Sequence, residues 1–161
     1  MGGRKYYRVP ICAQGILTRD NYVFWLRRES RAIYQRFGIY SQVKPQPTCK
    51  EIVEQINTLA HLKGYRCYYT NVLLDWSLLL YSERLPKRNR RNPLLSKFDK
   101  MPAVDIALQP TGKYNLRICS WLVAEMKYNV LEPEFIDICS AISLNMKLPR
   151  WEGKNGKISS T

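Results

Sequence analysis

The stretch PAVDIALQPTGKYNLRICSWLVAEMKY, residues 102–128, decides the fold class of this chain. It contains two apolar runs, at 103–108 and 116–128, which are separated by a turn sequence with Pro110 and Gly112. Short apolar runs on either side of a proline and glycine turn are typical of two antiparallel strands. The sequence therefore predicts a β-hairpin here.

Two helices are predicted upstream of the hairpin. Asp20 or Asn21 is suited to cap a helix that runs to about residue 37, where a glycine follows. Thr48 and Glu51 have the spacing of a capping box, in which each residue satisfies a backbone amide of the other. This box predicts a second helix that ends at Gly64.

The segments between and after these elements complete the predicted architecture. Residues 65–70 are aromatic and β-prone and predict a strand, whereas residues 72–82 fit a buried helix or a strand equally well. Residues 132–146 have the apolar spacing of an amphipathic helix, with Phe135, Ile136, Cys139, Ile142 and Met146 on one side. Together these elements predict an α/β fold.

Composition limits the classes of function. The 161 residues include 26 Lys plus Arg against 13 Asp plus Glu, a net charge of +13, and 45% are hydrophobic. A chain of this size and composition is expected to form one domain over 1–161, with an arm at 1–17 and a flexible tail at 153–161. The charge points to a polyanionic partner, and nucleic acid is the leading candidate.

Several other classes are disfavoured. No apolar stretch approaches the roughly 20 residues of a membrane-spanning helix, and the N-terminus has no apolar segment of the roughly 7–15 residues found in a signal peptide, so we expect an intracellular, cytoplasmic protein without membrane contact. Five cysteines without a CxxC pair argue against a zinc finger. A single histidine, His61, excludes an HExxH protease.

Basic side chains gather in two segments that are candidates for phosphate contact. The first helix is expected to expose Arg27, Arg28, Arg31 and Arg36. The loop at 84–100 interleaves basic residues with proline and asparagine, and flexible guanidinium groups there suit a phosphate backbone. The candidates for nucleic-acid binding are Arg27, Arg28, Arg31, Lys87, Arg88, Arg90, Arg91 and Lys97.

Two carboxylates lie within apolar runs, where a buried charge is costly unless it is paired. They are Asp105 in AVDIAL and Glu125 in LVAEMKY, and Lys127 follows Glu125 by two positions. Strand side chains alternate with a period of two, so Glu125 and Lys127 are predicted on one face of the second strand. Strand pairing is then expected to bring Asp105 to that face.

This pattern, PAVD followed by EMK, resembles the PD-(D/E)xK nuclease superfamily, and in particular Holliday-junction resolvases, the VRR-NUC group and small homing endonucleases. The resemblance covers residues 48–146 and implies a restriction-endonuclease-like core of a helix, three strands and a helix. It implies that Asp105 and Glu125 bind Mg²⁺ or Mn²⁺, that Lys127 orients the attacking water, and that Glu54 or Glu51 completes the metal site, with Glu54 preferred. The expected function is metal-dependent DNA endonuclease activity, site-specific or junction-specific, in a homodimer or higher homo-oligomer.

Two alternatives of other classes remain open. A non-catalytic nucleic-acid-binding module would use the same basic segments and leave Asp105, Glu125 and Lys127 in the scaffold. A protein that binds an acidic partner protein would show little salt dependence of nucleic-acid binding.

Overall fold

The computed structural model describes residues 7–39, 45–84, 98–108, 113–128 and 130–147. Within these ranges the chain is mixed α/β, which confirms the predicted class. The elements in chain order are η1 (Ile11–Ala13), α1 (Arg19–Ile39), α2 (Cys49–Lys63), η2 (Trp76–Arg84), β1 (Pro102–Leu108), β2 (Tyr114–Ser120), α3 (Trp121–Lys127) and α4 (Glu132–Lys147).

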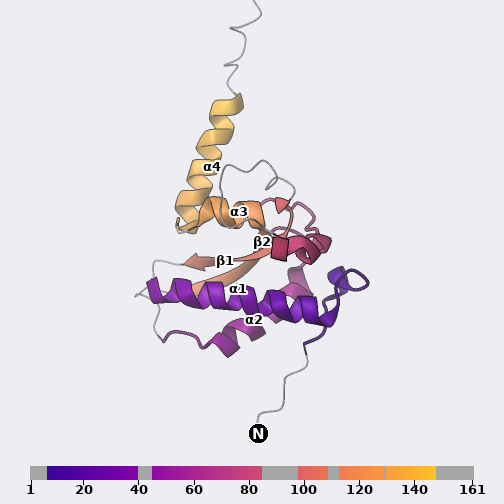
Figure 1. The fold of residues 1–161 in the computed structure, drawn as a ribbon. Coiled ribbons are helices and arrows are strands. Elements are labelled where there is room, and N and C mark those ends of the chain that lie inside the picture. The colour runs from indigo at the N-terminus through magenta and orange to yellow at the C-terminus, as the bar shows by residue number, and fades with distance from the viewer. Residues whose placement is uncertain (1–6, 40–44, 85–97, 109–112, 129, 148–161) are drawn as a thin grey trace, which may run out of the picture.

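The predicted hairpin lies at the centre of the fold. Strands β1 and β2 pair antiparallel from Pro102 opposite Ser120 to Leu108 opposite Tyr114. Helices α1 and α2 lie on one side of this hairpin and α3 lies on the other (Figure 1). It is the one sheet among the described residues, so the three-stranded restriction-endonuclease-like core is not confirmed.

Local signals set the starts of the two long helices. The side chain of Thr48 accepts a hydrogen bond from the Glu51 amide and the Glu51 carboxylate accepts from the Thr48 amide, so the predicted capping box is confirmed. Helix α1 begins at Arg19, and the Thr18 hydroxyl accepts a hydrogen bond from the Asn21 amide at 3.2 Å. Thr18 therefore caps α1, where Asp20 or Asn21 was predicted.

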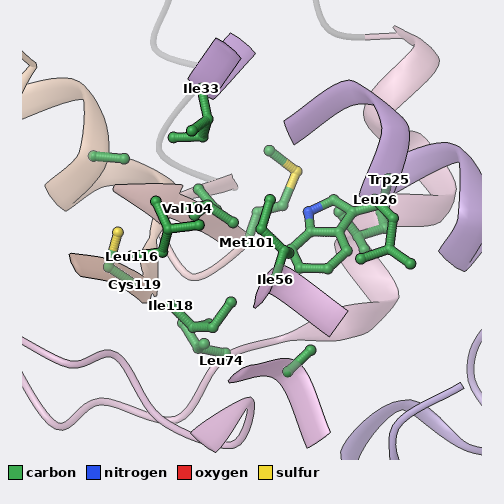
Figure 2. Close-up of a cluster of buried hydrophobic side chains, with 14 of the residues drawn as sticks. Trp25, Leu26, Ile33, Ile56, Leu74, Met101, Val104, Leu116, Ile118 and Cys119 are labelled. Atoms are coloured by element: carbon green, nitrogen blue, oxygen red, sulfur yellow. The ribbon is translucent and has the colours of Figure 1, made fainter. Parts of the chain in front are cut away.

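The core forms where α1 and α2 pack against the hairpin. Figure 2 shows Trp25 and Leu26 of α1 in one apolar cluster with Ile56 of α2 and Val104 of β1. The indole of Trp25 packs edge-on against Trp76 with ring centroids 5.0 Å apart and donates a hydrogen bond to the Pro102 carbonyl at 3.1 Å. Because buried indole N–H groups need a partner, this bond also fixes α1 against the start of β1.

Two strand predictions are wrong. Residues 65–70 form a turn, with one isolated bridge between Arg66 and Leu73 and a left-handed Asn71 at φ 57°. The second run of the hairpin is a strand only as far as Ser120, whose hydroxyl accepts from the Val123 amide and starts α3. The segment at 72–82, left open by the sequence, is neither a strand nor an α-helix, and from Trp76 it belongs to the 3-10 helix η2, which runs to Arg84.

Helix α4 confirms the helix predicted at 132–146, but not its buried face. Phe135 is buried, whereas Ile136 and Ile142 are each about half exposed. The reason is that α4 projects away from the hairpin and the other helices (Figure 1). None of the helices in the described ranges has the length and hydrophobicity needed to cross a bilayer.

Candidate functional site

Asp105 is the centre of a buried polar cluster between the hairpin and α3. Its side chain is fully buried on β1. Carboxylate oxygen Oδ2 accepts a hydrogen bond from the Tyr69 hydroxyl at 2.8 Å and lies 3.0 Å from the Lys127 ammonium nitrogen. The other oxygen, Oδ1, lies 4.0 Å from Nη1 of Arg36. One carboxylate is thus surrounded by two cations and a phenol.

Lys127 reaches this cluster from α3. The helix follows β2 directly and folds back over the hairpin, so its last residue lies above β1. The ammonium group donates a second hydrogen bond, of 3.0 Å, to the Ile106 carbonyl, and the whole residue is only 2% exposed. The structure therefore brings Asp105 and Lys127 together, as the sequence predicts, but from a helix rather than from a strand.

The other predicted acids are placed elsewhere. Glu125 belongs to α3 and not to a strand, so it lies about 200° around the helix axis from Lys127. The shared face predicted for these two residues is wrong. Glu54 lies on α2, across the hairpin from α3 (Figure 1), and Glu51 is engaged in the capping box with Thr48.

The predicted Mg²⁺ or Mn²⁺ site does not fit the cluster as folded. Mg²⁺ binds carboxylate oxygens and keeps several waters, which requires accessible oxygens and space. Asp105 is buried, its Oδ2 is already bonded, and two cations lie beside it. No group of three Asp, Glu, His or Cys side chains suited to a metal occurs in the described ranges. We therefore derive no metal-dependent step here.

Burial sets the protonation of the groups around Asp105. Burial, followed by the charge of Asp105 and the hydrogen bond to it, raises the pKa of Tyr69 far above its ordinary value. The phenol stays protonated and acts as a donor. Burial, followed by the charge of Asp105, likewise raises the pKa of Cys119 well above that of a free thiol. Tyr69 and Cys119 thus stay neutral beside the Asp105–Lys127 ion pair, and Tyr69 donates a hydrogen bond to it.

A different surface collects exposed basic side chains. Arg27 and Arg31 of α1 and Lys50 of α2 line a groove of about 270 Å³ between the two helices, together with Tyr7 of the N-terminal arm. None of the described residues that line it is acidic. Arginines four positions apart on a helix are neighbours on its surface, so the two guanidinium groups share one side of the groove.

The remaining basic candidates differ in their surroundings. Arg28 donates two hydrogen bonds to one oxygen of Glu29, at 3.0 and 3.1 Å, so its charge is partly balanced. Arg36, expected to be exposed, is instead part of the Asp105 cluster. The loop candidates Lys87, Arg88, Arg90, Arg91 and Lys97 lie outside the described residues.

Sequence reasoning missed two contributors, Tyr69 and Lys50. Tyr69 was assigned to a strand, and nothing in its local sequence marks it as a partner of Asp105. Lys50 lies two positions after the N-cap of α2, where the helix start predicts an exposed side chain but not the groove it shares with α1. Comparison with known proteins adds no assignment: no family model matches the chain, and no curated protein or solved structure shows significant similarity to it.

Proposed function

We propose that this protein binds nucleic acid through the groove between α1 and α2, without catalysis. One observation carries the proposal: Arg27, Arg31 and Lys50 come from two helices to line one groove that has no acidic residue among its described lining. Three cations so placed repel one another, and a phosphate backbone relieves that repulsion while it releases its own counterions. The net charge of +13 also attracts a polyanion, and it does so over longer distances.

The groove also offers an apolar and aromatic component. Tyr7 lies at its edge and is partly exposed, and it belongs to the basic arm RKYYR. Aromatic rings beside cations are the combination with which proteins bind single strands, because every base has a face that stacks. DNA is the partner that the sequence predicts, and RNA or a single strand uses the same contacts.

Metal-dependent DNA cleavage is a second candidate, favoured by one specific observation. Asp105 and Lys127 meet at 3.0 Å, as the PD-(D/E)xK resemblance implies. The positions of Glu125 and Glu54 and the burial of the pair support the non-catalytic proposal instead. A homodimer stays a prediction that belongs to this second candidate.

The binding proposal is tested by anisotropy titrations of labelled duplex DNA, single-stranded DNA and RNA over a range of salt concentrations. Arg27→Gln with Arg31→Gln should weaken binding and reduce the salt slope by about 1.8 on duplex DNA, because each phosphate contact contributes about 0.9. Lys100→Gln with Lys113→Gln removes the same charge from exposed positions away from the groove and should keep the slope. If both double variants lost affinity and salt slope equally, the groove would be refuted as the binding site.

Cleavage is tested in parallel with supercoiled plasmid and a four-way junction in Mg²⁺, Mn²⁺ and EDTA. We expect no cutting above the level of Asp105→Asn. Metal-dependent cutting that this variant and Glu125→Ala both lose would overturn the non-catalytic proposal and establish the nuclease.

A further inference from the structure

A second basic pocket lies at the opposite end of α2 from Lys50. A cavity of about 310 Å³ is enclosed by the last turn of α2, the turn at 65–71 and β2. This volume is at the lower end of the range of about 300–1,000 Å³ that ligand sites occupy. Most of its wall is apolar, and the polar groups in it are few, as in sites that bind small molecules.

The charged groups of this pocket are all positive. Lys63, Arg66 and Arg117 line it, from α2, the turn and β2 respectively, and its described lining contains no Asp or Glu. Across the hairpin, Asp105 lies directly opposite Arg117 in the strand register. Its Oδ2 is bonded to Lys127 and Tyr69 and its Oδ1 lies 4.0 Å from Nη1 of Arg36, so two other cations already offset its charge.

Arg117 is held in place and still has an unpaired hydrogen-bond donor. Its guanidinium lies 4.2 Å from the ring centroid of Tyr68, and its Nε is buried without a hydrogen-bond partner. A buried donor left unpaired is destabilising, and a bound acceptor would remove that penalty. The unpaired Nε therefore points to a ligand with an anionic oxygen.

The turn that carries the other side chains is rigid. The amide of Cys67 donates to the Val72 carbonyl at 2.8 Å, and the amide of Tyr68 donates to the Ile118 carbonyl of β2 at 3.0 Å. Arg66 donates through one nitrogen to the Asn71 carbonyl at 2.8 Å, which fixes its side chain while leaving other N–H donors. Such pre-formed donors bind an anion without a further ordering cost.

Aromatic surface lies beside these cations. Tyr65 lines the pocket and its side chain is 47% exposed, next to Leu62 on the last turn of α2. A planar ring placed here would stack on Tyr65 or lie against Leu62, which favours a nucleobase over a bare phosphate.

We propose that this pocket binds a nucleotide, with the phosphate against Lys63, Arg66 and Arg117 and the base beside Tyr65. The pocket is separate from the α1/α2 groove: Lys50 and Lys63 are about 20 Å apart along α2 and about 140° apart around it. The proposal therefore goes beyond binding in the groove and does not depend on it. The nucleotide is either free in solution or the phosphorylated end of a strand.

The test is calorimetric titration with AMP, adenosine and inorganic phosphate. AMP should bind more tightly than either fragment, because it alone supplies both phosphate and ring. Lys63→Gln and Arg117→Gln should each weaken AMP binding about tenfold or more, the effect of losing a charge-assisted hydrogen bond. Tyr65→Leu should weaken AMP but leave inorganic phosphate unchanged. Lys63 is exposed on the last turn of α2, so its variant remains informative if Arg117→Gln does not fold.

Two controls make the outcome specific. Arg27→Gln with Arg31→Gln, the groove variant, should bind AMP like the parent, whatever it does to strand binding. A 5′-phosphorylated oligonucleotide that displaces AMP, where its unphosphorylated twin does not, assigns the pocket to strand ends, and absence of displacement assigns it to free nucleotides. No AMP binding at millimolar concentration, or equal binding by the parent and Lys63→Gln, would overturn the proposal.

Discussion

Replacement of Lys127 by methionine tests whether the buried ion pair belongs to the scaffold. Methionine matches the length of the lysine stem, so the change removes the 3.0 Å contact with Asp105 and the bond to the Ile106 carbonyl without opening a large cavity. Breaking a buried pair by removing one partner costs about 3–5 kcal/mol, since the remaining charge is uncompensated.

The structure points to the lower end of this range. Arg36 stays 4.0 Å from Oδ1 of Asp105, and Tyr69 still donates to Oδ2. We therefore expect Lys127→Met to lower the free energy of unfolding by about 3 kcal/mol. For a chain of this length, that loss corresponds to a fall of roughly 6–12 °C in Tm.

Urea unfolding followed by the fluorescence of the buried Trp25 and Trp76 measures this change. The double variant Asp105→Asn with Lys127→Met removes both charges and should recover most of the stability, because a buried pair replaced as a unit is often neutral. It should also bind nucleic acid like the parent. A single variant as stable as the parent, or a double variant less stable than the single one, would refute the reasoning.

Three further predictions concern the cap, the end of α2 and the groove. Thr48→Ala should lower the free energy of unfolding by about 1 kcal/mol, measured by urea unfolding. Hydrogen bonds from Thr48 lower the pKa of Glu51, so the stability that Glu51 contributes is present above the carboxyl pKa of the unfolded chain and is lost as pH falls through the pKa of the folded one. Glu51→Gln should therefore flatten the acid limb of a stability-pH curve. Gly64→Ala should destabilise the fold by about 1–3 kcal/mol, since a Cβ there would clash with the Ala60 carbonyl oxygen and lie 3.1 Å from Trp76; an unchanged Tm would contradict this packing. Cys49 is exposed in the α1/α2 groove, so saturating nucleic acid should slow its reaction with N-ethylmaleimide several-fold, and no protection would argue against the groove.

The sequence predicts elements wherever a local signal sets their ends. The capping box of Thr48 and Glu51 fixes the start of α2, and the turn sequence with Pro110 and Gly112 falls between the two paired strands. These signals act over three or four residues, so they need no knowledge of the rest of the fold. They account for α2 and the hairpin, cap and glycine signals predict α1 approximately, and helical periodicity accounts for α4.

Prediction fails where one sequence satisfies two periodicities. Residues 116–128 are apolar enough to alternate as a strand, but Val123, Ala124 and Lys127 are buried with the spacing of a helix. The deciding feature is Ser120, whose hydroxyl caps α3 after the strand has ended. Similarly, the β-prone residues 65–70 are held as a turn by the left-handed Asn71 and by a bond from Tyr68 to β2, which is a tertiary contact.

The Asp105 cluster explains why a correct pairing of residues does not establish a catalytic site. Along β1, Val104 packs with the α1 and α2 core (Figure 2), and its neighbour Asp105 points toward Lys127. A shift of one residue in the strand register would exchange these faces and bury the carboxylate among apolar side chains, away from its lysine. The ion pair thus penalises the wrong register and ties α3 to β1, a structural role that requires Asp105 and Lys127 to meet in a closed interior. Catalysis would require the same two groups to be open to substrate, and their burial is therefore the property that separates the two interpretations.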